Sequence, residues 1–274
     1  MKTTSRRFGA VPVVGRPWLI TTAVCVASLA SSAAASTAHA QSLPSAAELV
    51  ARHDSLVGGR ALLEAHASMR VRGKMTIPVA GIEAPFEIRK RKPDAYRFEA
   101  SLGPGAELRQ GFDGTIAWAV QGDQPVILEG DQRDQIVNQA DFYADLHDPA
   151  QFTSMETVRE TRFGDRACYE VRMTRVNGDV VYEYFDVETG LSAGGSSTVQ
   201  SGEGTLTQTS IFTDYRTFDG YRMATRIVQQ NPQFEVILSI DSVSFDDVDA
   251  SEIAPPDTIR ALSRRPTSGD PSSW

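Results

Sequence analysis

The chain has 274 residues, of which 27 are Lys or Arg and 35 are Asp or Glu, so its net charge at pH 7 is −8. This acidity argues against a nucleic-acid-binding protein, because that kind of affinity depends on neutralising phosphates. Of the two cysteines, only Cys168 lies outside the N-terminal segment described next. The rest of the chain therefore cannot form an internal disulfide and depends on packing for its stability.

The first forty residues have the pattern of a signal peptide. A basic start precedes a mostly apolar run at residues 18–30, and Ala38-His39-Ala40 fits a signal-peptidase site before Gln41. The run is short for a membrane span, which needs about 20 apolar residues, so an uncleaved anchor is the weaker alternative. We predict cleavage after residue 40 and export to the periplasm, by either the general or the twin-arginine route. The segment holds four basic and no acidic residues, which leaves 23 basic against 35 acidic residues and a net charge of −12.

The mature chain is predicted to open with an amphipathic helix. Ser45-Ala46-Ala47-Glu48 fits a capping box, in which the Ser hydroxyl and the Glu carboxylate satisfy free amides of the first turn. Apolar residues follow at helical spacing until Gly58-Gly59 breaks the pattern, and a short second helical piece spans residues 60–66. An amphipathic helix next to a sheet with one apolar face usually covers that face.

Ser68–Ile77 is the clearest predicted strand. Apolar and polar side chains alternate along it, with Met69, Val71, Met75 and Ile77 on one face and Arg70, Arg72, Lys74 and Thr76 on the other. A period of two is typical of an antiparallel sheet that is covered on one side, so the basic face is expected to point outward. Gly73 interrupts the apolar face and is a plausible bend where the sheet curls.

The remaining chain reads as a meander of strands with one helix inserted. Residues 131–147 are predicted to be a helix that ends at Asp148-Pro149, and Asn177-Gly178 is a strong hairpin signal in the second half. About eleven strands with short turns favour a mainly β (α+β) domain over residues 41–256. We expect one large curved antiparallel sheet in the form of an incomplete barrel, with two helices on its concave face. Residues 257–274, rich in Ser, Arg and Pro, are expected to be a disordered tail.

No residue pattern typical of catalysis or metal binding stands out. Asp145, His147 and Asp148 are interpreted as a solvated helix end, and His53 as a packed or edge residue. Cys168 has no obvious His partner and is interpreted as a packed or half-exposed residue. The acidic residues from 246 to 252 do not match a calcium-binding loop and are interpreted as a solvated turn. We therefore predict no cofactor, no metal and no enzymatic activity.

Apolar and aromatic side chains on alternating strand positions are candidates for one concave surface. An ordinary core packed against the two helices is the competing interpretation for each of them. A large curved sheet with only two covering helices can also leave an apolar cavity, which in an exported protein suggests a lipid-like ligand. The candidate lining residues are Met75, Phe86, Ile88, Tyr96, Phe98, Trp118, Tyr169, Val171 and Met173.

Several short motifs resemble those of the bacterial lipoprotein-sorting carriers, the LolA/LolB-like family. They span residues 45–256 and include Val57-Gly58-Gly59-Arg60-x-Leu62, Gly111-Phe112-Asp113-Gly114, and the segment from Tyr184 to Leu191. The resemblance implies an unclosed barrel whose apolar concavity is plugged by helices. It also implies acyl-chain transport across the periplasm, or envelope-stress sensing in related members. In the carriers an inner-strand arginine holds the helical lid, and Arg89, Arg91 and Arg97 are all candidates here.

These observations lead to two functional hypotheses. The first is a monomeric periplasmic protein that binds a lipid or lipoprotein acyl chain in lipoprotein sorting or envelope maintenance. The second is a non-catalytic module that recognises envelope proteins, or senses stress, and has a filled core. Neither hypothesis involves nucleic acid or a stable membrane span after cleavage.

Overall fold

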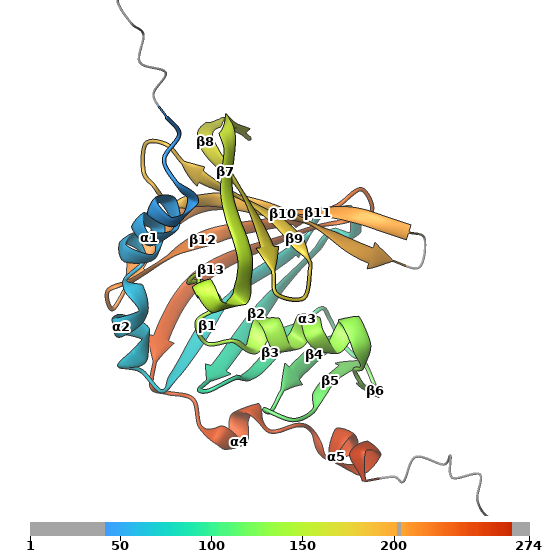
Figure 1. Cartoon of the computed structure of the whole chain (residues 1–274). Coiled ribbons are helices and arrows are strands. Elements are labelled where there is room, and N and C mark those ends of the chain that lie inside the picture. Colours follow the sequence, from blue (N-terminus) through green and yellow to red (C-terminus); the bar gives the residue numbers. More distant parts are fainter. Residues whose placement is uncertain (1–41, 202–203, 265–274) are drawn as a thin grey trace, which may run out of the picture. The chain divides into compact units, whose positions relative to one another are not determined.

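The computed structural model describes residues 42–201 and 204–264, so the predicted signal peptide and residues 265–274 of the predicted tail lie outside it. Within these ranges, thirteen strands form one antiparallel sheet (Figure 1). The strands are β1 (Ser68–Ile77), β2 (Ile82–Arg91), β3 (Ala95–Ser101), β4 (Glu107–Phe112), β5 (Ala117–Gln121), β6 (Gln124–Ile127), β7 (Phe152–Phe163), β8 (Arg166–Arg175), β9 (Val180–Asp186), β10 (Ser192–Ser201), β11 (Gly204–Phe218), β12 (Tyr221–Gln230) and β13 (Glu235–Phe245).

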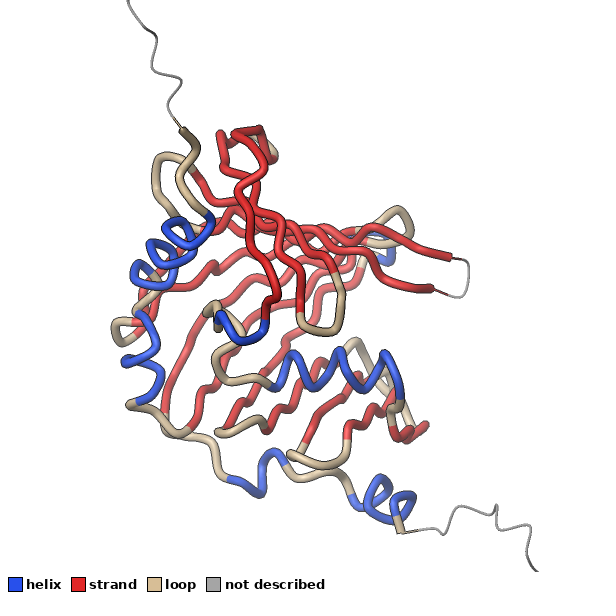
Figure 2. The backbone as a smooth tube through the Cα atoms, in the orientation of Figure 1, coloured by secondary structure: helices blue, strands red, loops and turns tan. Residues whose placement is uncertain are grey.

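The sheet is strongly curved and open (Figure 2). Its strand order is β6-β5-β4-β3-β2-β1-β13-β12-β11-β10-β9-β8-β7, so β6 and β7 form the two edges although they are consecutive in the chain. The pairing of β1 with β13 brings the two ends of the domain together in mid-sheet. This confirms the predicted mainly β fold with an incomplete barrel. The short strand β6 was not predicted; it contains Pro125, which an edge strand tolerates because one side of its backbone needs no partner.

Strand β1 confirms the alternation in the sequence on its apolar face. Met69, Val71 and Met75 are buried. The register against β13 shifts between Arg72 and Gly73, which is the bulge expected where a sheet bends. A Cβ at Gly73 would lie 2.0 Å from the Ser239 carbonyl oxygen, so only glycine fits there.

The helices at the start of the domain also follow the prediction. They are α1 (Ala46–Leu56) and α2 (Gly59–Glu64). The capping box at Ser45 is present: its amide donates to the Glu48 carboxylate at 2.9 Å, and its hydroxyl accepts from the Glu48 amide at 3.3 Å. Gly58 between the helices has a φ of 117°, a backbone conformation that would be strained for any residue with a side chain.

The mid-chain helix is shorter than predicted. Helix α3 (Gly130–Ala140) ends at Ala140, and residues 141–148 form a turn-rich stretch that we call the α3–β7 segment. Asp141 stops the helix because its side chain accepts a hydrogen bond from the Tyr143 amide at 2.9 Å, in competition with a helical backbone. The spacing of apolar residues suggested a longer helix. In the structure Phe142 and Leu146 lie beyond the helix, and both side chains enter the core.

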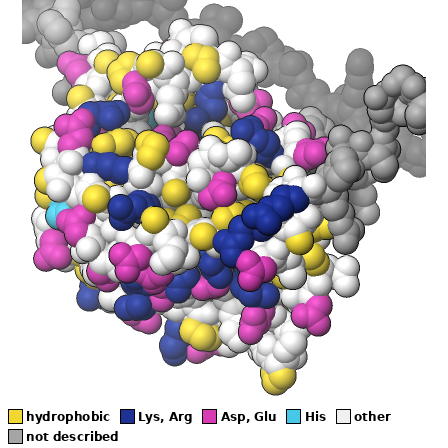
Figure 3. Space-filling model, turned by 90° about the horizontal axis from the view of Figure 1, so that it is seen from below, with side chains coloured by type: hydrophobic (Ala, Val, Ile, Leu, Met, Phe, Trp, Pro, Cys, Tyr) yellow, Lys and Arg dark blue, Asp and Glu magenta, His cyan; other side chains and the backbone are white. Residues whose placement is uncertain are grey.

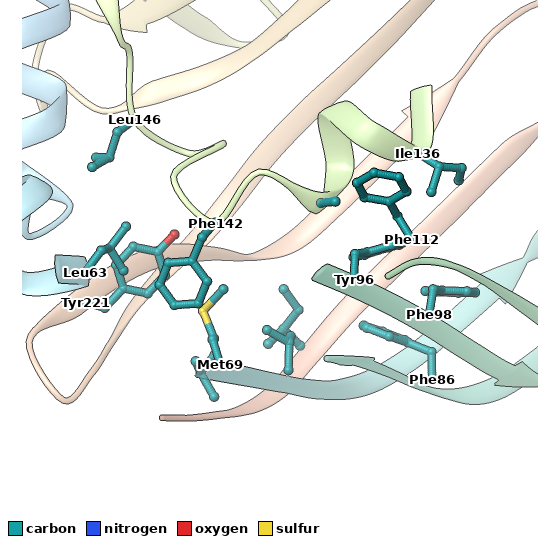
Figure 4. Packing of buried hydrophobic residues seen from close by; sticks show 14 of the residues in the cluster. Leu63, Met69, Phe86, Tyr96, Phe98, Phe112, Ile136, Phe142, Leu146 and Tyr221 are labelled. Atoms are coloured by element: carbon teal, nitrogen blue, oxygen red, sulfur yellow. The ribbon is translucent and has the colours of Figure 1, made fainter. Parts of the chain in front are cut away.

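The largest core cluster fills the concave side of the first half of the sheet (Figure 4). In the close-up, Phe86, Phe98 and Tyr96 of β2 and β3 lie below Phe112 and Ile136, while Leu63, Met69, Phe142 and Tyr221 gather at the other end. A second cluster places Ala46, Leu49 and Val50 of α1 against Val171, Met173 and Phe185. Helix α1 thus covers the second half of the sheet and α3 the first.

The opposite face of the sheet corrects one prediction. Arg70 does not point into water: it is 6% exposed, and it contacts Glu87 at 2.5 Å and Glu252 at 3.0 Å. Helix α4 (Ala250–Ile253) lies over this face next to β2 and β3, and its one acidic residue, Glu252, pairs with Arg70 and Arg89. The interpretation of the acidic stretch as a solvated turn holds for Asp246, Asp247 and Asp249, which are exposed, whereas Glu252 is half-buried and pairs with Arg70. Basic and acidic side chains are intermixed on the face seen in Figure 3.

Part of the predicted tail is ordered. Residues 257–263 form α5 (Asp257–Ser263), whose Ile259 is 0% exposed and packs with Trp118 and Val120. The polar composition of this stretch led to the prediction of disorder, but two of its apolar residues, Ile259 and Leu262, pack against β5.

Candidate functional site

A cavity of about 530 Å³ lies on the concave side of the second half of the sheet. Its walls come from the inner faces of β8 to β12, from α1 and α3, and from the α3–β7 segment. In Figure 1, α1 lies at one end of the curved sheet and α3 lies across its open side. The large core cluster fills the corresponding space under β1 to β5.

Small residues on β10 explain why this half is hollow. Gly194, Gly195, Ser196 and Ser197 all line the cavity, where β2 and β3 instead carry Phe and Tyr. A Cβ at Gly194 would lie 2.0 Å from the Ser210 carbonyl oxygen, so no larger residue fits without moving β11. In the sequence, Gly194-Gly195-Ser196-Ser197 could be judged only as a run that does not fit the motif of a catalytic serine. In the structure the same run forms part of the cavity wall.

A largely buried histidine, with a side chain 10% exposed, bridges two carboxylates at the cavity wall. Nδ1 of His147 lies 2.8 Å from Oδ1 of Asp54 on α1, and Nε2 lies 2.7 Å from Oε2 of Glu183 on β9. Burial alone lowers the pKa of His147, but the charge of Glu183 and the hydrogen bonds to both carboxylates outweigh it and raise the pKa to about 10. Burial likewise raises the pKa of Glu183, and the His147 charge overcomes this and holds it at about 2. We conclude that His147 is a cation and Glu183 an anion at neutral pH.

His53 lies beside this bridge and is neutral. Its ring centroid is 5.7 Å from that of His147, and its Nδ1 accepts a hydrogen bond from the Ser192 amide at 3.0 Å. Accepting a bond from an amide requires an unprotonated Nδ1. Burial, together with the His147 charge, lowers the pKa of His53, while Glu183 opposes the shift. The prediction that His53 is a packed residue is confirmed, since it is 5% exposed.

The interpretation of Asp145, His147 and Asp148 as a solvated helix end is only partly right: Asp145 is exposed and the Asp148 side chain is 43% exposed, but the helix ends at Ala140. The His147 side chain is only 10% exposed, and Asp145 accepts a hydrogen bond from the hydroxyl of Tyr221 on β12. No local pattern could have shown this, because Asp54 and Glu183 lie 93 and 36 positions away from His147 in the sequence. The α3–β7 segment is thus tied to α1, β9 and β12 by polar contacts.

One inward-facing cation also contacts the α3–β7 segment. Lys90 follows Phe86 and Ile88 on the inner face of β2, and its Nζ donates to the Asp141 carbonyl at 3.0 Å. Burial lowers the pKa of this ammonium group, and Asp145 and Asp141 oppose the shift. Because side chains alternate along a strand, Arg89 and Arg91 point to the other face. Lys90, which was not among the predicted candidates, therefore occupies the position facing the segment.

The nine predicted lining residues divide among three clusters. Met75, Phe86, Ile88, Tyr96 and Phe98 belong to the core under α3, and Tyr169, Val171 and Met173 lie with α1. Trp118 lies on the opposite face under α5, because its neighbour Ala117 takes the inward position on β5. Of the nine, Met173 lines the cavity.

Other candidate chemistry is limited in the described part of the chain. Cys168 is 0% exposed, and burial raises the pKa of its thiol, which makes it a poor nucleophile. Among residues 42–201 and 204–264, no group of three or more His, Cys, Asp or Glu side chains is placed to hold a metal ion. Over the same residues, no helix has the length and apolar character that crossing a membrane requires.

Comparison with solved structures identifies the fold. A LolA superfamily protein from Nitrosomonas europaea matches over 78% of this chain and 99% of its own, with a TM-score of 0.50 and 13% identity. A DUF1329 family protein from Desulfovibrio piger matches over 76% and 95%, with a TM-score of 0.54 and 12% identity. No protein-family model matches the sequence, and no curated protein matches it significantly. The chain therefore has a LolA-like fold, as the sequence motifs had indicated.

Proposed function

We propose that this chain is an exported, non-enzymatic periplasmic protein that binds a lipid or a lipoprotein acyl chain. The observation that carries the proposal is the cavity of about 530 Å³. Small-molecule sites commonly measure roughly 300–1,000 Å³, so the space suits a single small ligand or chain. Apolar side chains supply part of its wall, among them Val57, Leu146, Met173, Val181 and Ile227.

The surroundings of the cavity support binding rather than catalysis. The side chains of His147 and Glu183 are engaged with each other, and Nδ1 of His53 is engaged with the Ser192 amide. The acyl-chain transport implied by the resemblance to the lipoprotein-sorting carriers suits such a cavity, and it would place the protein in lipoprotein sorting or envelope maintenance. The α3–β7 segment, held by polar contacts, is the element that would move to admit a ligand.

The test is to identify what the purified protein carries. The full chain, expressed with its own N-terminus and isolated from the periplasm, is analysed by native mass spectrometry and lipid extraction. We expect a bound lipid that is lost in Ser197→Trp, which fills the cavity. Thr198→Trp is the matched control, because Thr198 is the exposed neighbour on β10 and does not line the cavity. Absence of lipid from the wild type, with no uptake of an apolar fluorescent probe, would refute the proposal.

A second candidate function is supported by the filled half of the concavity. Under β1 to β5 the large core cluster occupies the interior, as expected for a protein-interaction or stress-sensing module. Crosslinking in cells distinguishes the two functions. A single envelope protein captured equally by the wild type and Ser197→Trp, with no lipid bound, favours the second.

A further inference from the structure

The polar part of the cavity wall consists largely of neutral hydrogen-bonding groups on the sheet. Ser197 pairs directly with Gln208, and Ser210 pairs directly with Gln229, so these four side chains lie side by side on the inner face of β10 to β12. Inward positions on a curved sheet are normally apolar, as they are under α3. We call these four residues the neutral polar patch.

The neutral polar patch is available for a ligand. None of its four side chains is hydrogen-bonded to another residue that the structure describes. All four are partly exposed rather than buried, so they face the hollow. Amide and hydroxyl groups in such a position are satisfied by water or by a bound molecule, and they both donate and accept hydrogen bonds.

The charged groups around the cavity, by contrast, balance in number. His147 is held between Asp54 and Glu183, and Asp145 accepts from the Tyr221 hydroxyl. The two arginines lie over aromatic rings, Arg175 at 5.4 Å from the Phe152 centroid and Arg222 at 6.0 Å from that of Tyr215. The cavity lining together with Asp54 therefore has three acidic groups against three cations: Asp54, Asp145 and Glu183 against His147, Arg175 and Arg222.

We infer that the cavity selects an amphiphile whose polar part is uncharged and bears several hydroxyl or amide groups. The apolar chain would lie along Val181, Met173 and Ile227, and the polar part along the neutral polar patch. An ionic headgroup placed along the neutral polar patch would lose its hydration without gaining a partner of opposite charge there, which is costly. This inference rests on the proposed function, because it names the ligand class of the same cavity.

Three probes with one chain length and different headgroups test the inference. Decyl maltoside is neutral and rich in hydroxyl groups, decyl sulfate is anionic, and decyltrimethylammonium is cationic. Each is titrated calorimetrically into the full protein below its critical micelle concentration. We expect the maltoside to bind at least about tenfold more tightly than either ion, a difference of roughly 1.4 kcal/mol. Equal or tighter binding of a charged probe overturns the inference and leaves the proposed function standing, whereas no binding of any probe overturns both.

Substitutions within the neutral polar patch locate the selectivity. We expect the double variant Gln208→Leu, Gln229→Leu to lose most of the preference for maltoside while retaining an apolar fluorescent probe. Gln132→Leu on the exposed side of α3 is the matched control, since Gln132 does not line the cavity. Gln229→Lys should raise the affinity for decyl sulfate. An unchanged preference in the double variant overturns the inference; should the variants fail to fold, the wild-type probe series decides it.

Discussion

Nε2 of His147 lies 2.7 Å from the Glu183 carboxylate, and this contact joins the α3–β7 segment to β9. The other ring nitrogen contacts Asp54, so the same imidazole also reaches α1. One largely buried side chain thus connects three elements at the wall of the cavity. It holds the segment together with the contacts of Tyr221 to Asp145 and of Lys90 to the Asp141 carbonyl.

The first prediction concerns stability and pH. The pKa of His147 is raised from 6.5 to about 10, so its contribution to stability is complete below pH 6.5 and is lost as the pH rises through 10. The pKa of Glu183 is lowered from 4.5 to about 2, so its contribution is present above pH 4.5 and is lost as the pH falls through 2. We expect His147→Gln to lower the free energy of unfolding by roughly 3 kcal/mol near pH 6, as measured by urea denaturation.

The pH profile provides the check on this assignment. Between pH 6.5 and 10 the stability of the wild type should fall more steeply than that of His147→Gln, because in this range His147 keeps its proton in the folded protein but has lost it in the unfolded chain. Parallel profiles for the two proteins would contradict the assignment of a charged His147.

The second prediction compares two arginines on β1 that share a partner. Arg70 and Arg72 both contact Glu87, but their side chains are 7% and 54% exposed. Arg70→Ala removes the buried cation that Glu87 and Glu252 share, although both carboxylates keep Arg89, and should cost roughly 3 kcal/mol of unfolding free energy. Arg72→Ala should cost less than about 1 kcal/mol, because exposed ion pairs contribute little. Equal losses in thermal or urea unfolding would show that burial is not the deciding factor.

The third prediction tests the bulge at Gly73. A Cβ there would lie 2.0 Å from the Ser239 carbonyl and 2.9 Å from the Phe86 ring. We expect Gly73→Ala to lower the unfolding free energy by roughly 3 kcal/mol, since β1 and β13 must separate to accommodate the methyl group. Gly81→Ala is the control: its Cβ would meet nothing within 4 Å, although its φ of 62° brings a small strain. A Gly73→Ala protein as stable as the control would mean that the sheet can adjust at this point.

The fourth prediction concerns the N-terminus. We expect the protein recovered from the periplasm to begin at Gln41, because Ala38-His39-Ala40 fits a signal-peptidase site. Intact-mass spectrometry measures this directly. Ala40→Tyr, which places a bulky residue at the cleavage position, should leave an uncleaved and membrane-retained chain. A wild-type chain that retains residues 1–40 in the membrane would support the anchor alternative.

Local sequence pattern was sufficient for much of the fold. The alternation in Ser68–Ile77, the capping box at Ser45 and the turn at Asn177-Gly178 each depend on neighbouring residues and on backbone geometry, so they are legible without the rest of the chain. The motifs that resemble the lipoprotein-sorting carriers are of the same local kind. They led correctly to a LolA-like fold, and the structural comparison agrees with them.

The position and character of the cavity depended on contacts between distant residues. Sequence spacing showed which side chains share a face of one strand, but not which face α4 covers, and so Arg70 was predicted to be exposed. It also could not show that Ser210 and Gln229 lie side by side, or that His147 lies between Asp54 and Glu183. Strand register and the path of the α3–β7 segment set these pairings, because they are fixed by the packing of the whole sheet rather than by neighbouring residues.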